Sequence, residues 1–157
     1  MDKKKSKNKG NKDLFRIISM FVMILLLPLL SALIFMGCEI IAHPTSIKMI
    51  QVCKIIIFGT PILLLLAYGY IMKEKITSIL SGVFLIPLFF FYVDILYLYD
   101  KFDPYFWLRW MVLYEYSPFM LICGLAGYFA SRGTKVSLLI AIFFGILFVY
   151  IMWGIGR

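Results

Sequence analysis

Ionisable side chains inside long apolar stretches are the first candidates for chemistry in this chain. They are Lys54, Asp94 and Glu115, while Glu39 and Arg109 stand at the ends of neighbouring stretches. An unpaired charge at the centre of a bilayer costs about 2.5–3.5 kcal/mol, so such groups pair with one another or mark the path of an ion or ligand. We predict that the five residues share one intramembrane ionic layer, in which Lys54 pairs with Asp94 or Glu115. A structural ion pair, or exposure at the membrane interface, explains the same pattern without a transport or ligand site.

Other residues that could bind a metal or act in catalysis lack suitable neighbours in the sequence. Asp100 and Asp103 are spaced like a metal-binding carboxylate pair, but they stand beside Lys101 and Pro104 with no further acidic partner. His43 is the only histidine, so a zinc site would lack its usual ligands and most serines lack a plausible base. We therefore expect no metal site, no cofactor and no enzymatic activity.

Three cysteines are too few for a disulfide framework. Cys38 and Cys53 lie near the two ends of a short link and could form a bridge in an oxidising compartment; whether they do stays open. The pair Gly37-Cys38, which follows a basic head and an apolar run, also imitates a lipoprotein processing site. The run is longer than a signal core, and bulky Phe35 and Met36 precede the cysteine, so we expect the first apolar stretch to be retained.

Five apolar stretches must position these residues, and each is long enough to cross a bilayer. The chain has 157 residues and is 63% hydrophobic, which is more apolar surface than a soluble domain of this length can hide. Because the backbone in lipid must satisfy its own hydrogen bonds, such stretches are helices. The sequence predicts an all-α membrane bundle of about five transmembrane helices over residues 17–157. The predicted spans are residues 17–36, 49–72, 76–98, 111–130 and 136–155.

The charges predict how the bundle is oriented in a cell membrane. Residues 1–16 contain seven Lys or Arg and two Asp, which is a net charge of +5. The whole chain has a net charge of +8. This head is too polar to fold alone, so we expect it to be disordered and cytoplasmic. With the N-terminus inside and the C-terminus outside, eleven basic residues fall inside and five outside. The start of the fourth span is blurred by Arg109 and Glu115, and if that span did not cross, the C-terminus would lie inside.

Small residues recur every four positions on the last two predicted helices. The two sets are Cys123, Gly127 and Ser131, and Ser137, Ala141 and Gly145. The short link between these helices makes them antiparallel, and folding the chain at Thr134 brings each small residue opposite another. Small residues let membrane helices approach closely, so we predict that these two stripes form the contact.

Each of the first four predicted helices also contains a proline, at Pro28, Pro61, Pro87 and Pro118. Proline removes a backbone hydrogen bond and kinks a helix, and kinks open the cavities that transporters use. Proline is equally tolerated in membrane helices that only pack.

These observations favour a non-enzymatic accessory or interaction subunit of the cell membrane, or a protective, immunity-like one. Its expected partners are the lipid bilayer and another membrane protein or a second copy of the chain. Nucleic-acid binding is not expected, because most of the positive charge lies in the short head. The alternative is a small transporter or channel component that uses the ionic layer on the outer side. An enzyme acting on lipid-linked substrates ranks below both.

Overall fold

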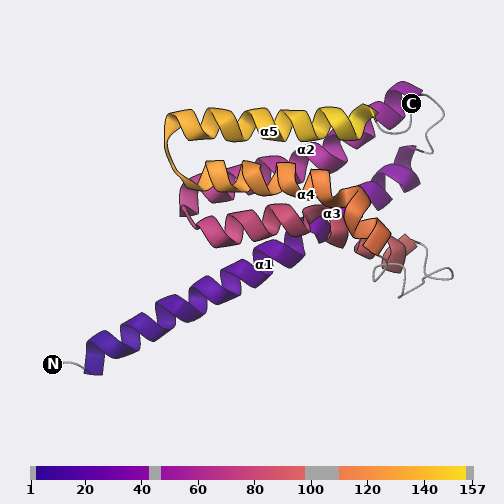
Figure 1. The fold of residues 1–157 in the computed structure, drawn as a ribbon. Helices are drawn as coiled ribbons and strands as arrows, with labels where there is room; N and C mark the ends of the chain where they lie inside the picture. Colours follow the sequence, from indigo (N-terminus) through magenta and orange to yellow (C-terminus); the bar gives the residue numbers. More distant parts are fainter. Residues whose placement is uncertain (1–2, 43–46, 98–109, 155–157) are drawn as a thin grey trace.

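A computed structural model of the chain contains five α-helices in the order that the sequence predicts (Figure 1). The helices are α1 (Lys3–Ala42), α2 (Ile47–Met72), α3 (Lys75–Tyr97), α4 (Trp110–Ser131) and α5 (Lys135–Gly154). The structure describes residues 3–42, 47–97 and 110–154, and within these ranges it contains helices and short links but no strand. The prediction of an all-α bundle is confirmed.

Four of these helices are long and apolar enough to cross a membrane. The spans are Ile17–Ile40 in α1, Met49–Met72 in α2, Lys75–Leu96 in α3 and Lys135–Met152 in α5. The fourth helix, α4, has 22 residues but is less apolar, because its first half contains the run Tyr114–Pro118. It packs against α2, α3 and α5 and runs beside them through the same layer (Figure 1). A central helix needs fewer apolar side chains than one surrounded by lipid, because its neighbours cover it.

The basic head differs from the predicted disorder of residues 1–16. The first helix continues without interruption back to Lys3, and its N-terminal part projects away from the other helices (Figure 1). Extending a helix that already exists is far easier than nucleating a new one. The head is also rich in lysine, a good helix former, and Gly10 is its only glycine.

Helices α3 and α4 approach each other closely, and glycines make this contact possible. A Cβ added to Gly127 would overlap the backbone carbonyl of Ser78, and one added to Gly82 would overlap that of Cys123. The two contacts have the same antiparallel register, since Ser78 and Gly82 are four residues apart, as are Cys123 and Gly127. Both helices thus present a small-xxx-small face, which lets their backbones approach.

The glycines of the two predicted small-residue stripes do not face each other. Helices α4 and α5 do pack together, but Gly127 of α4 and Gly145 of α5 each face another helix. Gly127 faces α3, while a Cβ on Gly145 would meet only Ile62 and Leu66 of α2 within 4 Å. Cys123 has no atom within 4 Å of the missing Gly145 Cβ, whereas its backbone carbonyl lies against Gly82 of α3. The other pairs of small residues between the two stripes stay predictions.

Ser131 and Ser137, the stripe residues next to the α4–α5 link, form hydrogen bonds within the ends of their own helices. Ser131 Oγ donates a hydrogen bond to the Tyr128 carbonyl over 2.7 Å. Thr134 and Ser137 cap α5 reciprocally, since each backbone N–H donates to the other side-chain oxygen over 3.2 Å. Gly133, with φ +67°, ends α4 in the left-handed conformation that favours glycine.

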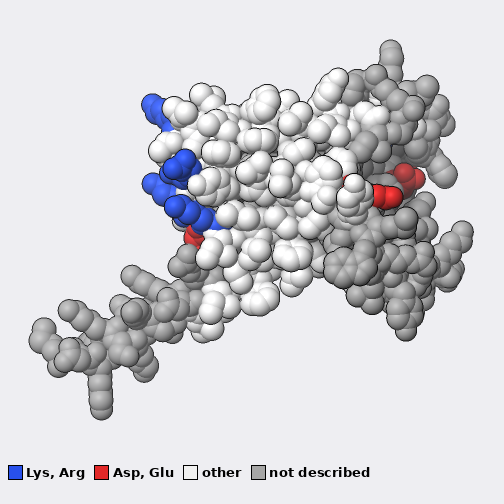
Figure 2. All heavy atoms as spheres, in the orientation of Figure 1, with Lys and Arg blue, Asp and Glu red and all other residues white. Residues whose placement is uncertain are grey.

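The described charges separate toward the two ends of the bundle. Figure 2 shows basic side chains gathered at the end that holds the α2–α3 and α4–α5 links. This cationic end contains Lys73, Glu74, Lys75, Arg132 and Lys135. The opposite end carries Glu39, Lys54, Asp94 and Glu115. The polarity agrees with the expectation that the two links lie inside.

Candidate functional site

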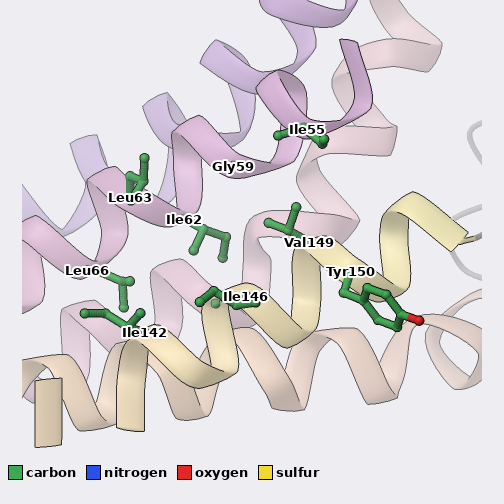
Figure 3. Close-up of a pocket in the computed structure, with 10 residues that line it drawn as sticks. Ile55, Gly59, Ile62, Leu63, Leu66, Ile142, Ile146, Val149 and Tyr150 are labelled. Atoms are coloured by element: carbon green, nitrogen blue, oxygen red, sulfur yellow. The ribbon is translucent and has the colours of Figure 1, made fainter. Parts of the chain in front are cut away.

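An apolar groove lies between α2 and α5 (Figure 3). It has a volume of about 580 Å³. We call it the α2–α5 groove. Its lining includes Ile55, Gly59 and Leu63 of α2 and Ile142, Ile146 and Tyr150 of α5. The Tyr150 hydroxyl points away from the other labelled side chains in Figure 3, so the groove offers apolar surface only.

Two glycines explain why a hollow exists at this place. Gly59 has no heavy atom within 4 Å of the position that a Cβ would take, so α2 leaves open space there. Gly145 allows Ile62 to approach α5, and the Cβ it lacks would lie 2.8 Å from the Ile62 side chain. Each helix thus contributes one residue without a side chain to the groove.

The face of α5 next to the groove is strongly exposed. Its outward residues Val136, Leu139, Phe143, Ile146 and Tyr150 are each more than 60% exposed and recur every three or four positions. Such a stripe lies on one side of a helix. In this bundle it faces the surrounding lipid or a partner, and it is continuous with the groove through Ile146 and Tyr150.

Four of the five residues of the predicted ionic layer lie among the described residues, and two of them line the same pocket. Glu39 of α1 and Lys54 of α2 line one small pocket of about 110 Å³, together with Cys38 and Cys53. We call this the α1–α2 pocket. Both charged side chains are half-buried.

The other two acidic residues of the layer lie near Tyr116. Asp94 of α3 and Glu115 of α4 both act electrostatically on the Tyr116 hydroxyl. Its ring stacks on Phe90 with 4.7 Å between centroids. Asp94 is half-buried and Glu115 is exposed. The pairing of Lys54 with either of these carboxylates stays a prediction, and Arg109 lies outside the described residues.

Sequence reasoning missed a polar network at the cationic end. The Tyr68 hydroxyl donates to Glu74 Oε2 over 3.1 Å, and Thr77 Oγ1 donates to the same oxygen over 3.0 Å. The Ser19 hydroxyl lies 3.5 Å from that of Tyr68. This network connects α1, α2 and α3. The signal in the sequence was Glu74, the only acidic residue of the basic link, with hydroxyl residues within about two helical turns on either side.

The two links of the cationic end also touch each other. The Lys73 stem lies over Gly133, where a Cβ would come within 2.8 Å of Lys73 Cε. The Arg132 guanidinium lies over the Tyr128 ring, 5.8 Å from its centroid. Glycine at position 133 thus permits both the positive φ and the close approach of the lysine.

The helix prolines do not line either hollow described above. Pro28 and Pro61 are among the fully buried side chains of the bundle, packed in its interior. Helix α4 bends in its N-terminal half, the half that contains Pro118 (Figure 1). The burial of Pro28 and Pro61 agrees with a role in packing.

Comparisons with known proteins found no match, whether with models of protein families, with curated proteins or with solved structures. Among the described residues, no three His, Cys, Asp or Glu side chains are grouped as a metal site would require. His43, Asp100 and Asp103 lie outside those residues. The α2–α5 groove and the two polar ends are therefore the features from which a function can be argued.

Proposed function

We propose that this protein is a non-enzymatic interaction subunit of a cell membrane that binds a transmembrane helix of another protein in the α2–α5 groove. The groove carries the proposal. It is apolar along its length, its described lining carries no charge, and it opens on the exposed face of α5. An occupant must therefore be apolar and must approach from within the bilayer.

A helix suits this groove better than a lipid chain does. Association of helices in lipid depends on close van der Waals packing, because the surrounding lipid is as apolar as the helices themselves. A rigid recess with a glycine on each side lets a partner backbone come near and lets its side chains fill defined space. A flexible acyl chain would lose conformational entropy on entering the same recess.

A protective role fits the same groove. A membrane-active peptide inserts as an apolar helix, and a bundle with an open helix-binding recess could hold it. In both versions the protein lies in the plasma membrane with its cationic end in the cytoplasm. An accessory role and a protective role differ only in the identity of the helix that the groove receives.

Gly59→Leu is the variant that tests this proposal. Gly59 has open space around its missing Cβ, so leucine would fill the groove without disturbing the bundle. A photoreactive amino acid at Ile146, which is 65% exposed and lines the groove, should give a discrete protein adduct in native membranes. Gly59→Leu should reduce the yield of that adduct at least about tenfold, the effect of about 1.4 kcal/mol.

Gly37→Leu is the matched control. Gly37 also has no heavy atom within 4 Å of its missing Cβ, but it lies on α1, away from the groove. The adduct should survive this change. Equal yields from both variants would contradict the proposal, and adducts with lipid alone would assign the groove to a lipid chain.

The transporter alternative has one supporting observation. Glu39 and Lys54 line the α1–α2 pocket at the end opposite to the cationic end, where an ion or small polar ligand would enter. The interior of the bundle is filled with buried apolar side chains such as Phe58, Leu65 and Phe148. The groove therefore supports the interaction role more strongly than the pocket supports transport.

A further inference from the structure

Two of the three cysteines lie side by side at the end of the bundle opposite to the cationic end. Cys38 lies near the end of α1 and Cys53 near the start of α2. The two thiols are close enough to interact with each other. Both line the α1–α2 pocket, and both are half-buried free thiols packed against the apolar core.

This contact joins residues that are fifteen positions apart in the sequence. The structure places no comparable partner beside the third cysteine. Cys123 is fully buried in the α3–α4 contact, where its backbone meets Gly82. The chain thus contains one pair of thiols in contact and one isolated thiol, which serves as an internal reference.

The charge polarity of the bundle predicts the compartment of the pair. Positively charged links remain in the cytoplasm, so the cationic end lies inside and the end with Cys38 and Cys53 lies outside. Disulfides form and persist on that side of a cell membrane, whereas the cytoplasm keeps thiols reduced. A disulfide needs the two Cβ atoms only about 4 Å apart, and two interacting thiols that line one small pocket on facing helices are placed for that approach.

We propose that Cys38 and Cys53 form an intramolecular disulfide that ties the C-terminal end of α1 to the first turns of α2. The pair forms by exchange with a protein or small-molecule disulfide. One cysteine attacks that disulfide and releases its first thiol; the second cysteine then displaces the other half as a thiol. One S–S bond breaks and one forms, the two protons end on the donor thiols, and the two electrons reduce the donor.

The bridge would fix the geometry of the α1–α2 pocket. Glu39 follows Cys38 directly, and Lys54 follows Cys53 directly, so a bond between the two sulfurs holds the two charged residues on facing helices. It also closes a loop and so restricts the unfolded chain. This inference does not depend on the α2–α5 groove or on the partner proposed for it.

Thiol counting on the full chain tests the inference. Membranes are quenched in acid, free thiols are blocked under denaturing conditions, and the sample is reduced and treated with a mass-tagged maleimide. The wild-type chain should gain two tags, and so should Cys123→Ser. Cys38→Ser and Cys53→Ser should each gain none. Mass mapping of the unreduced wild type should recover the peptide that joins Cys38 to Cys53.

Reduction should also lower the thermal stability of the wild type in detergent. The same treatment should leave Cys38→Ser and Cys53→Ser unchanged, because neither can form the bridge. A wild-type chain that gains no tag after reduction would overturn the inference. So would a bridge found only between two copies of the chain on a non-reducing gel.

Discussion

At the residue scale, the ionisable side chains of the outer end are where chemistry was expected. The sequence predicted one layer of five residues, and whether the four described ones form it stays a prediction. Lys54 shares the α1–α2 pocket with Glu39, whereas Asp94 and Glu115 lie around Tyr116. The depth of each residue along its helix is readable from the sequence. The side of the helix on which each residue faces its neighbours cannot be read from the sequence, because it depends on how the bundle packs.

Lys54→Met is predicted to destabilise the protein more when made alone than when combined with Glu39→Leu. Removing one partner of a half-buried pair leaves an uncompensated charge, which costs more than removing both. Thermal unfolding of the four variants of the cycle in detergent gives the coupling free energy, expected at about 0.5–3 kcal/mol.

Parallel cycles with Asp94→Leu and Glu115→Leu test the pairs that the sequence suggested. A larger coupling in either would show that Lys54 pairs across the layer. If all three cycles are additive, these residues do not form pairs, and the transporter alternative loses its main support.

At the element scale, the helix glycines are of two kinds: some lie where two helix backbones meet, and others face open space. Gly82 and Gly127 allow α3 and α4 to meet at the backbone, whereas Gly59 faces a hollow. The prediction that small residues mark a close helix contact was sound for α4. At Gly127 the helix it meets is α3, because α3 also carries small residues four apart, at Ser78 and Gly82.

Gly127→Ala is predicted to destabilise the bundle by about 1–3 kcal/mol, the cost of overpacking a closely packed contact. The added methyl group would overlap the Ser78 backbone, which cannot rotate away as a side chain can. Thermal unfolding in detergent measures the change.

Gly59→Ala is the matched control, because it adds the same methyl group to a helix glycine with open space around it. It should have no destabilising effect, since alanine also favours a helix over glycine. Equal losses from both variants would mean that the α3–α4 contact is not the constraint.

At the scale of the whole molecule, the separation of charge predicts one orientation in the membrane. The cationic end, with four basic residues and Glu74, belongs inside, and the end with Glu39, Asp94 and Glu115 belongs outside. An odd number of crossings then places the C-terminus outside.

Cysteine accessibility in a chain without its natural cysteines tests this orientation. A cysteine at Ser6 should react with an impermeant reagent only after the membrane is opened, whereas one added after Arg157 should react in intact cells. Equal protection of both positions would contradict five crossings, and α4, the described helix that is not among the four apolar spans, would be the first to reconsider.

The sequence by itself determined the helices and their order. The predicted spans at 49–72 and 136–155 match α2 (Ile47–Met72) and α5 (Lys135–Gly154) closely. This follows because a backbone in lipid has to form its own hydrogen bonds, so length and apolarity decide each helix locally. The first span, predicted at residues 17–36, is the exception, because α1 runs from Lys3 to Ala42 and extends beyond both ends of the prediction.

The tertiary structure alone decided which faces of those helices meet. All helices are apolar around most of their surface, so periodicity cannot tell a face that packs from one that contacts lipid. The α3–α4 contact through Gly82 and Gly127, the groove beside Gly59 and the meeting of Cys38 with Cys53 all depend on that choice. Each arises from residues far apart in sequence, and packing in three dimensions brings them together.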